Sequence, residues 1–395
     1  MRPSTASALA ALCLALAGCA APFGPAATTS RECWPSFPYQ DGWLGGDAAY
    51  AVRLSESETL WLFGDSFVGE PGQRDRRGAT FIHNSIAKSR CEPGGRFQIR
   101  YSWGRDAEGG ARAFLDPGQP GAWWWLFDGF VHDDRLYVGL LAVESAPPHG
   151  PLAMPFRFGG MELARIENYR DDVDEWRVEV IGLSQLRTAL PGSAMVVHDA
   201  YVYLFTFVAQ ADGHYPRILT RLPLSALDGR TRDLGPALEY LAHDGAWKPG
   251  LDPQEARIVM DDSATEMSVR YAPELGKWLA LYSYPEVGAG FPKARPSDAV
   301  WVRSAESVEG PWSPRRLLFR IPELDPSYVG GFDPNTACYA AKEQPQFSKG
   351  SRITFTYVCN LFTGAGQDPN AILGRLLDEM GLYRPMPVSV VLPEL

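Results

Sequence analysis

Two aspartates, each directly preceded by glycine, are the residues whose type and spacing most clearly suggest chemistry. Asp47 follows a glycine pair, and Asp65 follows the apolar run TLWLFG. The chain between them reads as a hairpin that turns at residues 55–58, and the midpoint of the two aspartates falls inside this turn. In a regular antiparallel pair they would lie opposite each other on one face, with Cβ atoms about 5 Å apart.

Two carboxylates this close do not both ionise freely, so one is expected to keep its proton near neutral pH. A proton donor beside a carboxylate base or nucleophile is what hydrolysis of a glycosidic bond requires. Asp47 and Asp65 are therefore the predicted catalytic residues, without a choice of which one gives the proton. A single aspartate next to glycine is more often a turn former, and a β-bulge at either glycine would shift the register.

Other polar and aromatic residues fall close to the expected strands. The residues predicted to bind substrate are His83, Asn84, Asp128, Glu266 and Trp125. Each also has a structural interpretation. His83 could be a satisfied structural histidine, Asp128 could form a turn with the glycine after it, and at least one residue of the run WWW must face the core of an alternating strand. Glu266 is expected inside a strand between apolar neighbours, where an unpaired carboxylate would be costly, so it is predicted to be functional or ion-paired.

The elements that must position these residues are short strands that recur along the chain. Five apolar segments rich in aromatic residues align on Leu60, Leu136, Val202, Trp278 and Ile353, and so recur every 76, 66, 76 and 75 residues. Most follow another strand-like segment, several precede a third, and only residues 371–381 have convincing helical periodicity. The pattern predicts an all-β fold, a five-bladed β-propeller, in which the first strands of all blades surround one channel. Two β-sandwiches are the alternative, although sandwich strands lack a regular period of this length.

The N-terminus carries a targeting pattern. Its apolar run is too short to span a bilayer and ends in Leu-Ala-Gly before Cys19. This resembles a bacterial lipoprotein signal, which implies removal of residues 1–18 and lipidation of Cys19. The small, proline-containing residues that follow have no periodicity and predict a flexible tether over 19–32, which leaves 33–395 for the predicted catalytic propeller. The residue after Cys19 is alanine rather than aspartate, which favours the outer membrane. The alternative is an ordinary secretory signal, and both interpretations predict export.

Four cysteines remain after the signal and the lipidation site: Cys33, Cys91, Cys338 and Cys359. In an oxidising compartment they can pair in three ways. Cys338 and Cys359 flank a predicted turn and would face each other on neighbouring strands, which favours this pair and leaves Cys33 with Cys91. The net charge of −10 provides no basic surface, so no nucleic-acid partner is expected and the lipid would hold the protein at the membrane.

The motifs GGDAAYAVRL, TLWLFGDSFVG and HNSIA, together with EMSVRYAPELGKWLALYS, resemble a bacterial family first described as domain of unknown function 4185, now glycoside hydrolase family 183. The resemblance extends from Trp34 to the C-terminus. It implies a five-bladed propeller that hydrolyses D-arabinofuranan, the polymer of arabinogalactan and lipoarabinomannan, from within the chain. The family's two acidic positions match Asp47 and Asp65. Ser66 stands where the family has threonine, and Ala48 and Ala49 stand where it has serine, so the substrate preference stays open.

These observations predict an exported, lipid-anchored glycoside hydrolase that cleaves furanoside linkages in an external polysaccharide, with D-arabinan as the expected substrate. Two alternatives remain: a non-catalytic carbohydrate-binding or adhesion propeller, and a glycosidase that acts on L-arabinan or fructan. Calcium occupies the channel of some related propellers, but no acidic cluster here has the spacing of a calcium loop and no Cys/His set has zinc spacing. No metal or cofactor is therefore predicted.

Overall fold

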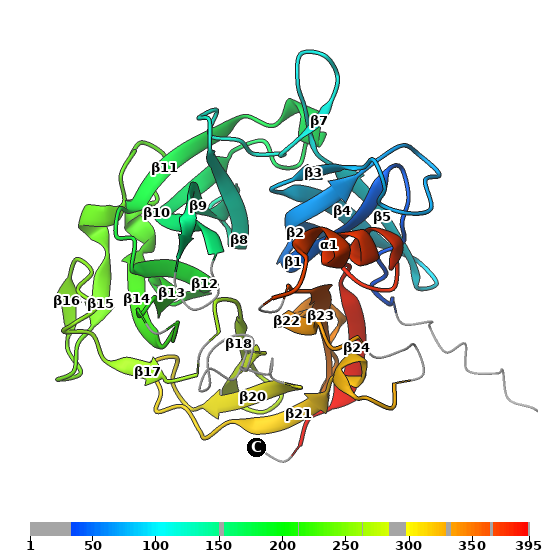
Figure 1. Ribbon diagram of the computed structural model, residues 1–395. Helices are drawn as coiled ribbons and strands as arrows, with labels where there is room; N and C mark the ends of the chain where they lie inside the picture. The colour runs from blue at the N-terminus through cyan, green and yellow to red at the C-terminus, as the bar shows by residue number, and fades with distance from the viewer. Residues whose placement is uncertain are drawn as a thin grey trace, which may run out of the picture.

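The computed structural model describes residues 33–149, 154–211, 213–262, 264–283, 298–328, 333–363 and 366–393. The predicted signal, Cys19 and the tether lie outside these residues. Five antiparallel sheets are arranged as blades around a common axis, and their order in the ring follows the order of the chain (Figure 1).

In each blade the first strand along the chain lies next to the axis. Blade one contains β1 (Trp43–Arg53), β2 (Glu58–Val68), β4 (Ser85–Glu92) and β5 (Arg96–Ser102), with β3 (Thr80–Ile82) also paired to β2. Blade two contains β8 (Ala122–His132), β9 (Arg135–His149), β10 (Met154–Ile166) and β11 (Val178–Ser184). Blade three contains β12 (Ala189–His198), β13 (Tyr201–Val208), β14 (Arg217–Pro223), β15 (Glu239–Leu241), β16 (Trp247–Pro249) and β17 (Ile258–Met260). Blade four contains β18 (Ser268–Ala272), β19 (Lys277–Tyr282), β20 (Ala299–Ala305) and β21 (Arg316–Arg320). Blade five contains β22 (Thr336–Glu343), β23 (Arg352–Leu361) and β24 (Met386–Val391).

The predicted five-bladed propeller is confirmed, and the alternative of two sandwiches is wrong. The five aligned segments are the second strands β2, β9, β13, β19 and β23, and the segments before them form the innermost strands. The helix expected over 371–381 is α1 (Pro369–Asp378), whose first turn is capped by the side chain of Asp368. A short pair, β6 (Gly104–Arg105) and β7 (Ala111–Arg112), lies outside the blades.

The second strands read as continuous apolar runs because both of their faces are buried. In β2, Leu60 and Leu62 pack into a cluster shared with blade two, whereas Trp61 and Phe63 pack on the other face of the sheet. All four side chains are at most 1% exposed. Burial between blades therefore accounts for the aromatic repeat that is visible in the sequence.

Two disulfides and one buried arginine fasten the parts of the chain that are far apart in sequence. The disulfides join Cys33 to Cys91 and Cys338 to Cys359, as expected, and the second pair lies in register on β22 and β23. The guanidinium of Arg76, a fully buried side chain, donates hydrogen bonds to backbone carbonyls of β1, of α1 and of the segment after it. These bonds hold α1 over the first blade (Figure 1). No helix in the described part of the chain has the length and apolar composition to cross a bilayer.

Candidate active site

The innermost strands β1, β8 and β22 each carry an extra residue close to residues of the candidate site. In β8 the pairing with β9 shifts between Leu126 and Gly129, so one residue of β8 has no partner. In β22 the shift lies between Tyr339 and Lys342, where Ala340 adopts the left-handed region with φ of 59°. Side chains alternate along a regular strand, so residues three apart would face opposite sides. The extra residue turns both members of such a pair to the same side.

The strand β1 is bulged in the same way. Its pairing shifts between Ala48 and Tyr50, and Ala48 and Ala49 have φ values of 63° and 60°. As a result the side chains of Asp47 and Tyr50 both make contacts near the axis. The bulges of β8 and β22 likewise lie between two residues that are three apart. The strand β2 is also bulged, around Asp65, and the register expected from the sequence holds on either side, with Gly46 opposite Ser66 and Tyr50 opposite Leu62.

The two aspartates predicted to be catalytic are brought together by this hairpin. A Cβ atom added to Gly64 would lie 2.5 Å from Oδ1 of Asp47, so the glycine before Asp65 leaves the room that the Asp47 carboxyl occupies. Burial raises the pKa of Asp47 well above its usual range, and the nearby charges of Asp65 and then Glu266 raise it further. The raised pKa favours the protonated form of Asp47, and the catalytic role of the two aspartates stays a prediction.

Two tyrosines contact the Asp47 carboxyl. Tyr339 of β22 donates a hydrogen bond to Oδ2 over 2.8 Å, and Tyr383, which follows α1, reaches the same oxygen at 3.4 Å. The hydrogen bond from Tyr339 stabilises the carboxylate and so opposes the rise in the pKa of Asp47. Burial raises the pKa of both phenols well above the ordinary value, so both hydroxyls remain hydrogen-bond donors at neutral pH.

Asp65 has different partners. The indole Nε1 of Trp125 donates to its Oδ1 over 2.8 Å, and Nδ1 of His83 lies 3.0 Å from the same oxygen. The imidazole of His83 stacks on Trp123, with ring centroids 4.3 Å apart. The other oxygen, Oδ2, makes no hydrogen bond within the described part of the chain. The indole N–H, and the imidazole in the tautomer protonated at Nδ1, donate to Oδ1, which leaves Oδ2 available to a ligand.

The remaining predicted binding residues occupy different surroundings. Asn84 is fully buried, and its side chain bonds the backbone of Leu115 and Trp124, so a direct contact with substrate is not open to it. Asn84 therefore has a structural role, and the prediction that it binds substrate is wrong. Asp128 lies within β8 rather than in a turn, and its Oδ2 accepts a hydrogen bond from the backbone N–H of Met195 on β12 over 2.8 Å. Burial raises the pKa of Asp128 to about 7.

Glu266 lies two residues before β18 and not inside a strand as expected. Its Oε1 is 2.7 Å from Nζ of Lys342, so the expectation of an ion-paired carboxylate fits the structure. The ammonium of Lys342 also lies over the ring of Tyr50, 4.2 Å from the centroid. Sequence reasoning missed Lys342, Tyr50, Tyr339 and Tyr383. A lysine inside the apolar strand CYAAKEQ was a signal for the first of these.

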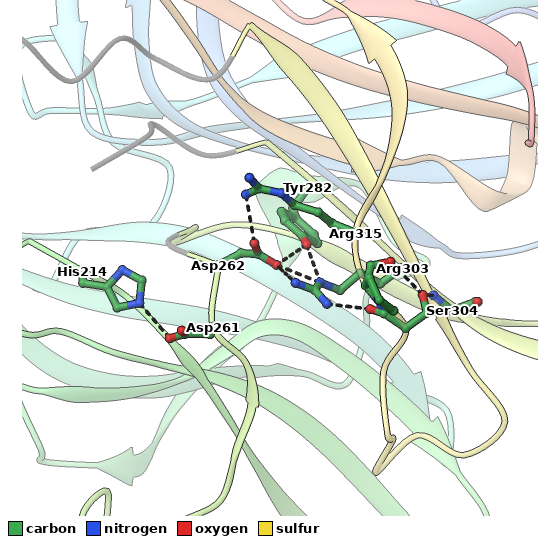
Figure 2. A network of polar contacts seen from close by, with 9 residues as sticks. His214, Asp261, Asp262, Tyr282, Arg303, Ser304 and Arg315 are labelled. Carbon is green, nitrogen blue, oxygen red and sulfur yellow. Dashed lines mark hydrogen bonds and ion pairs between the residues drawn. The ribbon is translucent and has the colours of Figure 1, made fainter. Parts of the chain in front are cut away.

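A network of charged residues fixes the segment that leads to Glu266 (Figure 2). Asp262 accepts hydrogen bonds from Nε of Arg303 over 2.8 Å and from Nη1 of Arg315 over 3.2 Å, and the Tyr282 hydroxyl contacts its Oδ2. The side chains of Arg303 and Tyr282 come from β20 and β19, so these contacts tie the end of blade three to blade four (Figure 2). Across the described ranges, no group of three or more His, Cys, Asp or Glu residues is arranged to hold a metal ion.

Solved structures share this architecture. A candidate hydrolase from Bacteroides ovatus superposes with a TM-score of 0.62 at 17% identity, over 88% of this chain and 86% of that chain, which shows a common fold. An endo-arabinase from Bacteroides thetaiotaomicron gives a TM-score of 0.45 at 11% identity, over 91% of this chain and 99% of its own. An α-L-arabinanase from Cellvibrio cellulosa gives 0.44 at 12% identity, over 88% and 91%.

A comparison with curated proteins finds no match. The family model that does match is not the one that the motifs resemble, so the resemblance to domain of unknown function 4185 stays a prediction. The match covers residues 36–386, which is most of the chain, and its description is domain of unknown function (DUF5005). This protein therefore belongs to the DUF5005 family.

Proposed function

We propose that this protein is a glycoside hydrolase that cleaves furanoside linkages within an external polysaccharide, and that its substrate is the D-arabinan of arabinogalactan and lipoarabinomannan. The observation that carries the proposal is the contrast between two neighbouring carboxyls, Asp47 and Asp65. One has tyrosine donors and a raised pKa, and the other has two nitrogen donors. The choice of D-arabinan rests on the resemblance of the motifs to glycoside hydrolase family 183.

In this proposal Asp47 is the proton donor. Its raised pKa favours the protonated form near neutral pH, as a general acid requires. Because Oδ2 already accepts hydrogen bonds from Tyr339 and Tyr383, the proton belongs on Oδ1, the oxygen beside Gly64. From that oxygen the proton would pass to the glycosidic oxygen of the leaving group.

Asp65 is the proposed nucleophile. Its Oδ2 attacks the anomeric carbon while the bond from that carbon to the leaving oxygen breaks, and Asp47 transfers its proton to the leaving oxygen. The Asp47 carboxylate next takes a proton from water, the water oxygen attacks the anomeric carbon, and Asp65 is released. This order retains the anomeric configuration, so NMR of the first product should show the configuration of the substrate. An inverted product would assign Asp65 as the base that activates water.

The N-terminal pattern supports a location outside the cell for this reaction. Removal of residues 1–18 and lipidation of Cys19 would hold the enzyme on the outer membrane, in contact with polysaccharide outside the cell. Replacement of Cys19 by alanine should then release active protein from the membrane fraction. Protein that stays in that fraction would contradict lipid anchoring at this residue.

The experiment that tests the proposed function measures reducing ends released from purified arabinogalactan. The wild type should release them, and Asp47→Asn and Asp65→Asn should each lower the rate on the order of 10³-fold. Asp298→Asn is the matched control, because Asp298 pairs with Arg320 and is exposed to solvent. Binding by the wild type without release would favour an adhesion protein. Release from L-arabinan or fructan alone would show a different specificity on the same site.

A further inference from the structure

The ion pair between Glu266 and Lys342 joins blade four to blade five beside the proposed catalytic pair. Lys342 lies three residues after Tyr339, whose hydroxyl contacts Asp47, and the bulge in β22 directs both side chains to the same side. The lysine is 1% exposed, whereas the Glu266 side chain is 13% exposed. The carboxylate is thus the member of the pair that a ligand can reach.

The two oxygens of Glu266 have different partners. Oε1 takes the hydrogen bond from Nζ of Lys342 over 2.7 Å, and Oε2 forms no hydrogen bond with any residue that the structure describes. An ionised carboxylate oxygen is a strong acceptor for a hydroxyl group. A sugar hydroxyl would supply the donor that Oε2 lacks.

Lys342 and Tyr50 form the support of this carboxylate. The lysine ammonium lies 4.2 Å from the centroid of the Tyr50 ring, and the Tyr50 hydroxyl donates to the backbone carbonyl of Ser193 over 3.0 Å, which fixes the ring. Without this cation Oε1 would lose its hydrogen-bond donor in a largely buried position, so the carboxylate would no longer be held in this orientation. The lysine does not reach the ligand itself, so its effect must pass through Glu266.

Glu266 is also close to the reacting groups. Its charge contributes to the raised pKa of Asp47, after burial and Asp65, and it contributes to the raised pKa of Tyr339 as well. Its ion pair with Lys342, three residues after Tyr339 on β22, places Glu266 on the side of the site where Tyr339 contacts Asp47.

We propose that Oε2 of Glu266 accepts a hydrogen bond from a hydroxyl group of the sugar unit bound beside Asp47 and Asp65, and that Lys342 is a positioning residue that holds this carboxylate in place through Oε1. The inference deepens the proposed function and rests on it for the identity of the ligand. It adds a binding residue and its support to a site whose chemistry is carried by the two aspartates.

The test measures binding by calorimetry in an Asp65→Asn background, with D-arabinan oligosaccharides as the probe and L-arabinan and fructan oligosaccharides as further arms. Adding Glu266→Gln should weaken binding about 10- to 100-fold, because the amide keeps its oxygen toward Lys342 and presents a donor where the sugar needs an acceptor. An affinity within twofold of the parent would overturn the role of Glu266.

Adding Lys342→Met instead should weaken binding, because Oε1 of Glu266 loses the hydrogen bond that orients its carboxylate. Lys342→Arg keeps a cation and should retain most of the affinity. An equal loss with both substitutions would mean that Lys342 has only a structural role.

A matched control separates the positioning role of Lys342 from a general contribution of ion pairs between blades to stability. Arg270 of β18 and Glu343 of β22 form a second ion pair between blades four and five, 2.8 Å apart. Arg270→Met should lower the melting temperature and leave the affinity unchanged. A loss of affinity in this control equal to that of Lys342→Met would overturn the positioning role.

The same preparations separate the two proposals. If the wild type releases no reducing ends but Glu266→Gln still weakens binding, the proposed hydrolysis is wrong and the sugar contact stands. If the wild type releases reducing ends and Glu266→Gln has no effect on affinity or KM, only the contact is wrong. A protein that binds none of the oligosaccharides would refute both.

Discussion

The hydrogen bond from Tyr339 to Asp47 allows a quantitative test of which carboxyl is the acid. Replacing Tyr339 by phenylalanine removes a donor that lies 2.8 Å from Oδ2 of Asp47 and stabilises its ionised form. The acid must be protonated to act, so the rate falls as the pH rises through its pKa. Removing the donor raises that pKa, and the fall should therefore move to higher pH.

The size of the shift follows from the strength of the bond. A hydrogen bond to a charged group contributes about 1.5–3 kcal/mol, and one pKa unit corresponds to about 1.4 kcal/mol. The full loss would thus move the alkaline limb by about one to two pH units. Tyr383 remains 3.4 Å from the same oxygen and can replace part of the lost bond, so we expect about one unit.

The assay is the pH dependence of kcat/KM for D-arabinan, measured from pH 4 to 10. Tyr137→Phe is the control, since it removes a buried phenol of blade two that contacts the backbone of Leu227, which follows β14 of blade three. This variant should keep the wild-type alkaline limb. A limb that stays in place or moves to lower pH in Tyr339→Phe would refute the assignment of Asp47 as the acid.

Three further variants test the packing around the site. Gly64→Ala places a methyl group 2.5 Å from the carboxyl of the proposed acid, so kcat/KM should fall about 100-fold, with a melting temperature close to wild type in circular dichroism. Replacing Cys338 and Cys359 together by alanine removes a disulfide that closes a loop with a sequence separation of 21, and should cost about 3 kcal/mol of stability; an unchanged midpoint in denaturant unfolding would contradict this. Arg76→Met leaves several buried carbonyls without donors and should lower the melting temperature by about 5 °C, roughly what a loss of several kcal/mol gives in a chain of this size. Arg77→Met, which removes an exposed ion pair, should have little effect.

The fold was predictable from the sequence because burial between blades imposes the same composition on every second strand. Leu60 and its four counterparts lie at equivalent places in the ring, so the repeat in aromatic residues became a repeat in space. The hairpin of Asp47 and Asp65 was predictable for a related reason. Local pairing and a short turn determine its register, and both can be counted along the chain.

The partners of this hairpin were not predictable in the same way. Tyr383 reaches Asp47 from beyond α1, and its place depends on how Arg76 holds that helix. No periodicity records such a contact. The role of Asn84 was predicted wrongly because a polar residue next to a candidate binding residue, His83, can equally bond the backbone, and only the packing of blade two against it decides between these roles. Bulges are also hidden in sequence, so Glu266 and Lys342 could not be paired in advance.

The bulges have a consequence for how this family of sites could diversify. A strand of ordinary pleat would offer alternate residues to the axis, whereas β1, β8 and β22 offer residues three apart. If one residue at a bulge were deleted, the earlier residues of that strand would turn over, so that those facing the axis would face away from it. No other residue would have to be substituted. Short insertions and deletions, more than point substitutions, would then be the steps by which one propeller acquires the ligand preference of another.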